Sequence, residues 1–369
     1  MQKIITLSVI LFFNCLVVFS QNNDDRFSNI QTEFFIGKPI EHDKKLDNAI
    51  QGNSYGVLVS WNKLNNKTTK FNKLFNYPER GYTFIYQDFN SPILGKSFGV
   101  YRHYTYNLTP KNNNPLKLTT GFGLGYVTEK YDVINNNQNF AIGSHLDATA
   151  FVKLNYFQYI IYNKLKINTG VSLLHFSNVS LKNPNLGINT VSVHLGLNYS
   201  IGEVKTIPLE NATPAALTTH KPLKYNAILR TGYNESLIEN SGLYPFYVAS
   251  LYTSKEINKY STLTAGLDFF ASKFLKNHIK YINSTENKNY NENKYQRGGI
   301  FVGHELTQNN FAFISQIGYT YYSEYNYVSK IYERFGFKYK LADHIFSEVS
   351  MKVNLFRAEA LEVGIGYSF

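Results

Sequence analysis

A histidine and a serine stand two residues apart in the stretch His175-Phe176-Ser177-Asn178, and residues of these types at this spacing could perform acyl transfer. Residues two apart on an extended strand point to the same face, so the imidazole and the hydroxyl can come within hydrogen-bond reach. A histidine base activates a serine nucleophile from that position. Such a pair is more often an ordinary surface feature in a chain rich in tyrosine and asparagine, so its surroundings must decide between the two interpretations.

The surrounding sequence alternates with a period of two. Between Val191 and Tyr199 every second side chain is apolar and the others are small or polar, and residues 361–369 repeat the pattern. Such alternation is typical of a strand with one apolar face. Similar segments, each followed by turn-forming residues, run at 54–62, 81–88, 95–107, 116–129, 144–158, 163–177, 223–235, 244–255, 260–272, 297–307, 310–322, 332–340 and 345–355, with a weaker one at 32–38. The sequence therefore predicts an all-β chain of about sixteen antiparallel strands.

These strands fit a transmembrane β-barrel. An outer-membrane barrel needs strands of roughly 9–11 residues with one apolar face, and no apolar run after residue 20 approaches the roughly 18 residues of a spanning helix. The chain has 30 tyrosines, which suit the interfaces of a membrane, and it ends on an aromatic residue, Phe369, as outer-membrane barrels commonly do. The formal charge of +11 suits a surface that meets anionic lipid, although a soluble basic protein would carry it equally well.

The first residues predict export. Lys3 is followed by an almost wholly apolar run from Ile4 to Phe19, which has the form of a secretory signal. We expect residues 1–20 to be this signal peptide, with cleavage before Gln21, and the mature chain to reside in the cell outer membrane. Cys15 lacks the small residues that precede a lipidated cysteine, so a lipoprotein is the minor alternative.

A seam divides the chain. Residues 202–222 contain three prolines and no alternation, and they predict a linker or a periplasmic turn. About eight predicted strands lie in residues 21–201 and about eight in residues 223–369. Two architectures remain open: one large barrel, or an eight-stranded barrel followed by a second β unit.

Counting strands places the histidine and the serine. If both ends of the first eight strands are periplasmic, the seventh strand runs outward and His175 and Ser177 lie at its external end. Val171 and Leu173 precede them on the same face, so the pair is expected to face lipid. Residues 179–187 then form an external loop, and Asn189 faces lipid beside the pair.

This stretch resembles the lipid A 3-O-deacylase (PagL-type) family, outer-membrane barrels that remove an ester-linked acyl chain from lipopolysaccharide. The resemblance is carried by His175-Phe-Ser-Asn178 and by Lys182-Asn-Pro-Asn-Leu-Gly-Ile-Asn189. It implies that His175 is the base, Ser177 the nucleophile, and Asn185 and Asn178 oxyanion donors. The second half looks more like the longer chains called acyloxyacyl hydrolases.

One residue departs from the family pattern. The resemblance implies a glutamate at the position of Asn189, where it would orient the histidine and offset its charge. An asparagine can accept a hydrogen bond from the imidazole but carries no charge, and an equivalent change in a serine triad costs on the order of 10⁴ in rate. Glu359, which has lipid-facing parity at the start of the final strand, and Glu305, beside His304, are alternative carboxylates.

The sequence thus predicts an outer-membrane esterase that removes acyl chains from lipid A or a related envelope lipid by a Ser/His mechanism. It implies no metal, no cofactor and no nucleic-acid partner, because the remaining histidines lack ligand spacing and there is no phosphate-binding loop or CxxC motif. The alternatives are a non-enzymatic barrel, as a pore or a structural protein, and an outer-membrane phospholipase. Lysine-rich runs such as 273–276 are expected to be solvated loops. The sequence leaves the oligomeric state open.

Overall fold

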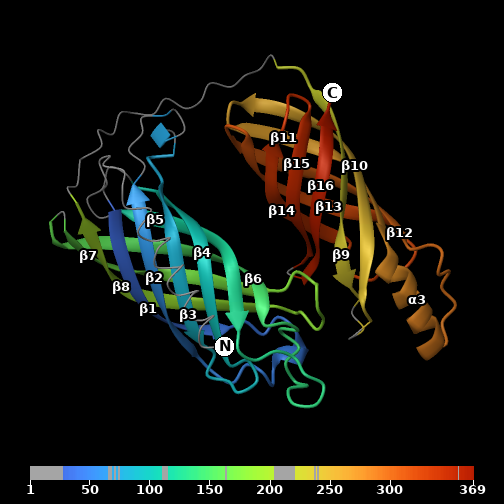
Figure 1. Cartoon of the computed structure of the whole chain (residues 1–369), viewed down its shortest axis with the longest axis horizontal. Coiled ribbons are helices and arrows are strands. Elements are labelled where there is room, and N and C mark those ends of the chain that lie inside the picture. Colours follow the sequence, from blue (N-terminus) through green and yellow to red (C-terminus); the bar gives the residue numbers. More distant parts are fainter. Residues whose placement is uncertain are drawn as a thin grey trace, which may run out of the picture.

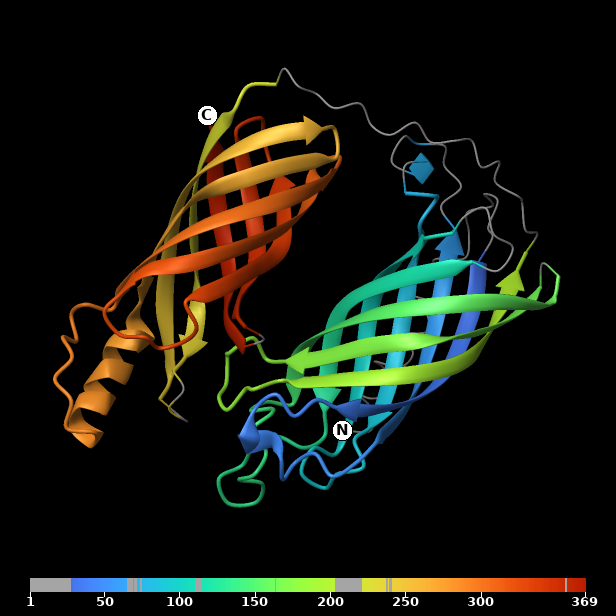
Figure 2. The same ribbon diagram turned by 180° about the vertical axis from the view of Figure 1, so that it is seen from behind.

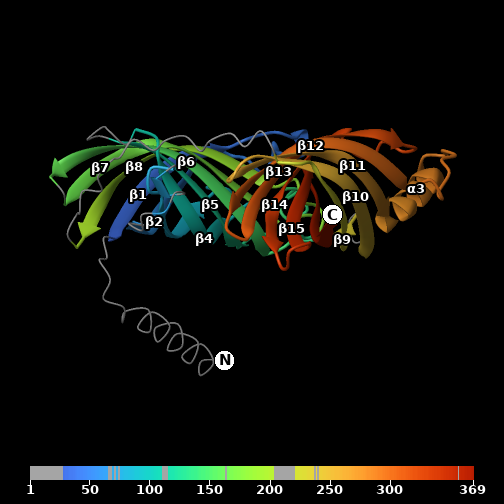
Figure 3. The ribbon, with the colours of Figure 1, turned by 90° about the horizontal axis from the view of Figure 1, so that it is seen from above.

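The computed structural model of the chain describes residues 28–64, 69, 72–73, 75–109, 115–162, 164–202, 221–236, 238, 241–355 and 357–369. Within them the chain forms two closed antiparallel barrels of eight strands each, which lie side by side (Figures 1 and 3). The predicted all-β class is therefore confirmed, and of the two architectures left open the second is found, with the second β unit also closed. The expected signal peptide, with Cys15, and nearly all of the 202–222 seam lie outside the described residues.

The first barrel closes through the pairing of its first strand with its eighth. Its strands are β1 (Ser28–Pro39), β2 (Ser54–Leu64), β3 (Glu79–Asp88), β4 (Lys96–Asn107), β5 (Leu116–Val127), β6 (Leu146–Ile161), β7 (Leu165–Ser177) and β8 (Ile188–Ile201), with a short 3-10 helix, η1 (Lys44–Leu46), after β1.

The second barrel closes through the pairing of β16 with β9. Its elements are β9 (Lys224–Glu235), β10 (Leu243–Asn258), β11 (Ser261–Ser272), α3 (Lys273–Thr285), β12 (Gln296–Gln308), β13 (Phe311–Ser323), β14 (Ile331–Lys340), β15 (Ile345–Asn354) and β16 (Arg357–Ser368). None of the helices in the described part of the chain is long and apolar enough to cross a bilayer.

The alternation along the strands sorts their side chains between the outside and the lumen. On β8, Val193 and Leu195 are each 56% exposed, whereas His194 between them is 3% exposed. The outward positions of the other strands likewise carry exposed Val, Leu, Ile, Phe and Tyr side chains. A water-soluble barrel would not expose an apolar belt of this extent, whereas the hydrocarbon core of a membrane would cover it.

We call one end of each barrel its distal end. It lies opposite to the end at which the first strand of that barrel begins and its last strand ends. The distal ends carry the loops that follow the odd-numbered strands, and both lie at the lower side of Figure 1. Loops close the distal end of the first barrel, where Phe89, Ile142 and Leu186 are buried in one apolar cluster with Phe176 of β7. The end of β7 is therefore held in a packed cap.

Both lumens are filled with polar side chains that bind one another. In the first barrel Glu33 accepts hydrogen bonds from Lys153 and Asn168, and all three are buried. In the second, Arg230 donates to Glu348 at 2.6 Å and Arg334 donates to Asp268 at 2.9 Å. Buried charges are stable only when paired in this way.

The helix α3 corrects the expectation of a solvated loop at 273–276. It packs Phe274, Leu275, His278 and Ile279 inward, and Phe274 contacts Tyr327 with ring centroids 5.0 Å apart. Those four positions follow the i, i+1, i+4, i+5 spacing of one helix face. The lysines occupy the other face, so the loop prediction failed because it weighed charge and not periodicity.

Candidate active site at the distal end of the first barrel

His175 and Asn189 are cross-strand partners on β7 and β8, and the register brings their side chains together. The Nδ1 atom of His175 lies 2.8 Å from the Oδ1 atom of Asn189. When Nδ1 carries the proton and donates it to the asparagine, Nε2 keeps a lone pair that can accept a proton. Val171 and Leu173, at 50% and 41% exposure, continue the same outward face of β7. The imidazole therefore belongs to the membrane-facing side of the barrel.

Ser177 is the last residue of β7, and the loop that follows covers it to 3% exposure. The side-chain amide of Asn185 donates a hydrogen bond from Nδ2 to Ser177 Oγ at 2.9 Å. The backbone N–H of Val179 also points at this oxygen, at 3.3 Å. Two donors thus converge on the hydroxyl, in the region where an oxyanion would form if Ser177 attacked an ester.

Asn178 orients Asn185. Its backbone N–H donates to Asn185 Oδ1 at 3.0 Å, which turns the Nδ2 group of Asn185 toward Ser177. The side chain of Asn178 donates instead to the carbonyl oxygen of Lys182 at 2.7 Å. The structure thus brings Asn185 to the serine, and it directs the side chain of Asn178 into the loop.

Gly187 is the last residue of the loop and lies next to His175. Its backbone φ is +78°, which residues that carry a side chain rarely adopt. A Cβ atom at this position would lie 3.3 Å from Cε1 of His175 and 3.8 Å from Cβ of Ser177. The two residues therefore border the same small space beside Gly187. Among the hydrogen bonds of the described residues, none joins His175 to Ser177, and contacts of this kind often form only with substrate bound.

The carboxylates expected as alternative acids lie elsewhere. Glu359 binds Arg297, Lys352 and Asn354 inside the second barrel and is 7% exposed. The prediction that it faces lipid is wrong, because a β-bulge opposite Lys352 and Val353 leaves Glu359 unpaired and reverses its side. Glu305 accepts a hydrogen bond from Lys338 at 2.9 Å, also within the second barrel.

One further residue near the site, Glu235, carried no signal in the sequence. Asn183 and Glu235 bind each other across the junction of the two barrels. Asn183 belongs to the Asn-Pro-Asn segment of the motif, but Glu235 is separated from it by 52 residues. Their pairing depends on how two closed barrels sit together, which strand periodicity does not report.

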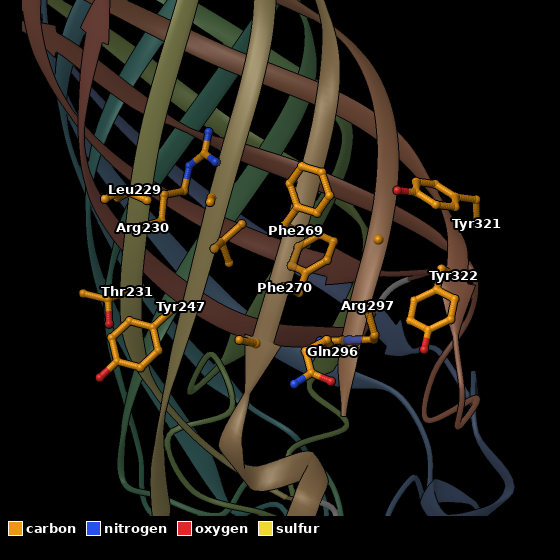
Figure 4. A pocket seen from close by; sticks show the side chains of 14 residues that line it. Leu229, Arg230, Thr231, Tyr247, Phe269, Phe270, Gln296, Arg297, Tyr321 and Tyr322 are labelled. Atoms are coloured by element: carbon orange, nitrogen blue, oxygen red, sulfur yellow. The ribbon is translucent and has the colours of Figure 1, made fainter. Parts of the chain in front are cut away.

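A hollow of about 600 Å³ lies on the outer wall of the second barrel (Figure 4). Exposed apolar and aromatic side chains border it, among them Leu229, Tyr247, Phe269 and Tyr321. None of its lining residues belongs to the first barrel, so it is separate from the surroundings of Ser177.

Two family models match the chain. The lipid A 3-O-deacylase (PagL) model matches residues 55–198, and the model of the acyloxyacyl hydrolase C-terminal domain matches residues 223–369. The chain belongs to the PagL-type lipid A deacylase and acyloxyacyl hydrolase family of outer-membrane β-barrels. The resemblance found in residues 175–189 is thereby confirmed, and this PagL-type chain is placed among outer-membrane deacylases, which are hydrolases.

Solved outer-membrane proteins resemble this PagL-type chain only distantly. The outer-membrane enzyme PagL shares 17% identity over 45% of this chain and 97% of its own length, with a TM-score of 0.33. The outer-membrane protein Omp33 of Acinetobacter baumannii shares 5% identity over 93% of this chain and 98% of its own, and a mutant Rhodopseudomonas blastica porin shares 8% over 93% and 99%, both with a TM-score of 0.18. No curated protein sequence matches the chain.

Proposed function

We propose that this PagL-type protein hydrolyses ester-linked acyl chains of lipid A or a related lipid of the outer leaflet, with Ser177 as nucleophile and His175 as base. The observation that carries the proposal is the convergence of Asn185 Nδ2 and the Val179 N–H on Ser177 Oγ, at 2.9 and 3.3 Å. Acyl transfer requires donors for the carbonyl oxygen of the ester, and Asn185 Nδ2 lies next to the hydroxyl at which that ester would react. The membrane-facing side of β7 is where an acyl ester of a lipid would arrive.

The reaction follows the two-step course of serine hydrolases. Ser177 Oγ attacks the ester carbonyl carbon while His175 Nε2 takes the hydroxyl proton, and Asn185 stabilises the negative charge on the carbonyl oxygen. The tetrahedral intermediate collapses as His175 returns the proton to the departing sugar hydroxyl. Water, deprotonated by His175, then attacks the acyl-serine, and His175 returns that proton to Ser177 Oγ as the fatty acid leaves. Asn189 holds the imidazole in the tautomer that these proton transfers require.

The filled lumens support an enzyme scaffold over a pore. Many charged side chains in the lumen would favour a pore, and the second barrel does carry buried inward charges. However, Arg230, Arg334 and Asp268 are each at most 2% exposed, and both arginines form ion pairs with Asp268. These charges are therefore paired inside the barrel, which favours a packed interior.

Two substitutions test the proposal. Ser177→Ala and His175→Ala should each abolish acyl release from lipid A by the purified, detergent-folded protein, as measured by mass spectrometry of the lipid and of the free fatty acid. Ser172→Ala is the matched control, because Ser172 lies on the same strand but faces the lumen, where its Oγ binds Ser192 Oγ at 2.6 Å.

Each outcome decides a different part of the proposal. Parent-like hydrolysis by Ser177→Ala would remove Ser177 as the nucleophile. Hydrolysis of a glycerophospholipid without hydrolysis of lipid A would replace the substrate class and favour the phospholipase alternative. Folding of each variant is checked by the rise in apparent mass on SDS gels when the sample is heated.

A further inference from the structure

The loop between β7 and β8, residues 178–187, bridges the two barrels. In Figures 1 and 2 this light-green loop reaches the distal end of the second barrel, at the end of β9 and the start of β16. Ser180 donates a hydrogen bond to the carbonyl oxygen of Ala358 and accepts one from the N–H of Glu235 at 3.1 Å. The loop that covers Ser177 is therefore held in part by another barrel.

Glu235 is the centre of this contact. Its carboxylate accepts a hydrogen bond from the backbone N–H of Asn183 at 2.5 Å. The side chain of Asn183 donates in return to the carbonyl oxygens of Glu235 and Ser236, at 3.2 and 2.7 Å. Glu235 is 4% exposed and Asn183 is also 4% exposed. A charge-assisted bond in a buried place is strong and directional, so it fixes the loop at Asn183.

The other half of the loop is fixed to the first barrel. The N–H groups of Leu186 and Gly187 donate to the carbonyl oxygens of Phe140 and Ala141, at 3.1 and 2.9 Å. Asn185 lies between these bonds and Asn183, so its position depends on both anchors. The junction is also tightly packed, because a hollow of only about 10 Å³ remains between Asn183, Glu235 and Ala358.

We propose that Glu235 of the second barrel is a positioning residue for the ester-hydrolysis site of the first, acting through Asn183 to hold Asn185 against Ser177. This inference rests on the proposed function. It gives the second barrel a role in the reaction, because the serine, the histidine and the oxyanion donor all come from the first. Without the anchor the loop can move by an ångström or more, and displacements of that size cost about 10²-fold in rate.

The test compares Glu235→Ala with Glu235→Gln in the full chain. Glu235→Ala should lower kcat by about 10–100-fold with little change in KM, because the donor to the oxyanion is displaced while lipid binding is kept. Glu235→Gln retains an oxygen that can accept from the Asn183 N–H, so it should retain most of the parent rate. Equal losses in both variants would overturn the hydrogen-bonding role.

A control separates this contact from general damage to the rim of the barrel. Glu333→Ala removes a carboxylate that accepts the N–H of Leu355 at 3.2 Å within the second barrel alone. It should leave kcat unchanged. In an Asn185→Ala background Glu235→Ala should add almost nothing, because its effect passes through the missing amide. The same loss in both backgrounds would show that Glu235 does not act through Asn185.

Hydrogen exchange distinguishes the failure of this inference from failure of the proposed function. Glu235→Ala should speed amide exchange in residues 181–183, and Glu333→Ala should not. Unchanged exchange in Glu235→Ala would overturn the positioning role whatever the activity. A parent chain that hydrolyses no lipid ester, but whose Glu235→Ala variant exchanges faster, would overturn the proposed function and leave the contact between the barrels standing.

Discussion

At Asn189 the proposed base is oriented by a neutral partner. The Oδ1 atom of Asn189 holds Nδ1 of His175 at 2.8 Å, so the tautomer is fixed without a carboxylate. An amide oxygen cannot offset the positive charge that develops on the imidazole when Ser177 is deprotonated. In a serine triad the corresponding loss of charge costs on the order of 10⁴ in rate. If Ser177 and His175 act as proposed, we expect hydrolysis to be slow.

Restoring the charge should raise the rate. In Asn189→Glu a carboxylate next to His175 favours the protonated imidazolium, which stabilises the transition state but also protonates more of the free base at low pH. At pH 8 and above an ordinary imidazole, with a pKa of about 6.5, is mostly neutral, so the first effect should dominate. A pH–rate profile of acyl release should show faster hydrolysis there. Asn189→Gln, an uncharged residue of the same length, should show no gain, and a gain equal to that of the glutamate would argue against a charge effect.

Asn185 tests the oxyanion donor directly. In Asn185→Asp the group facing Ser177 changes from an N–H donor to an oxygen of similar shape, which repels a developing oxyanion. Removing a single donor of this kind costs about 10²–10³ in kcat, and the aspartate should cost at least that. Steady-state kinetics on lipid A measure it, with heat-shifted gel mobility as the check of folding. A parent-like kcat would exclude Asn185 from the reaction.

At the scale of the element, the β7–β8 loop depends on Gly187. Gly187→Ala combines a strained φ with a Cβ atom 3.1 Å from the carbonyl oxygen of Phe176 and 3.3 Å from His175 Cε1. The left-handed conformation costs about 1–2 kcal/mol for an alanine, and the crowding should displace His175. We expect a clear loss of kcat with the barrel still folded.

The control for Gly187 is a glycine that also has a positive φ but lies at the other end of the barrel. Gly202, after β8 at the proximal end, also has a positive φ, of +88°. Gly202→Ala should lower stability by a comparable amount and leave kcat unchanged. If the two variants lose activity equally, backbone strain and not crowding at His175 is responsible.

Strand periodicity predicted most of the fold because one face of each strand meets lipid. The predicted strand at 163–177 corresponds to β7, and His175 and Ser177 lie at its end, as the predicted bounds indicated. Val171 and Leu173 are exposed on its outward face, as the alternation indicated. The start of β16 could not be predicted, because its bulge reverses the side of Glu359 and a bulge adds a residue without any mark in the pattern. Sixteen strands also close equally well as one barrel or as two, so counting alone left the architecture open.

The contacts around the site were predictable only where they are local. Asn185 follows Ser177 by eight positions and lies in the same motif, so the sequence pointed to it. Glu235 reaches Asn183 from another barrel, and that contact exists only after both barrels have closed. A single sequence holds no signal for such a pairing.

At the scale of the whole molecule, the two barrels differ in what fills them. The first barrel holds Glu33 and Lys153 in a mainly neutral polar lumen, whereas the second holds a network of fully buried arginines and carboxylates. The barrels meet at the loop on Glu235 and also at their outward apolar faces, where the ring of Phe122 lies 6.1 Å from that of Phe337. The stability of the second barrel and the placement of the loop are thus linked through a small contact.

Arg334 offers the means to loosen the second barrel alone. It binds Asp268 and Glu362 at 2.9 and 2.7 Å, and all three are buried. Arg334→Leu removes the guanidinium nearest to both carboxylates and leaves only Arg230, at 4.0 and 3.8 Å from them, which should destabilise the second barrel by about 3–5 kcal/mol. Lys340→Leu is the comparison, because its pair with Asp343 is exposed and contributes about 0–1 kcal/mol. The midpoint of the heat shift on SDS gels should fall for Arg334→Leu only.

Activity measured along the same temperature series then shows whether the second barrel serves the first. If Glu235 positions the loop, acyl release by Arg334→Leu should fail at the temperature where the second barrel opens, below the temperature at which the first barrel unfolds. Limited proteolysis, with fragments assigned to residues before and after 202–222, reports the two barrels separately. Activity that persists after the second barrel has been digested would show that the first barrel keeps Asn185 in place unaided. If the loop must be anchored at both ends, the loss of activity and the opening of the second barrel should have the same midpoint temperature. This should hold in both the parent and the variant.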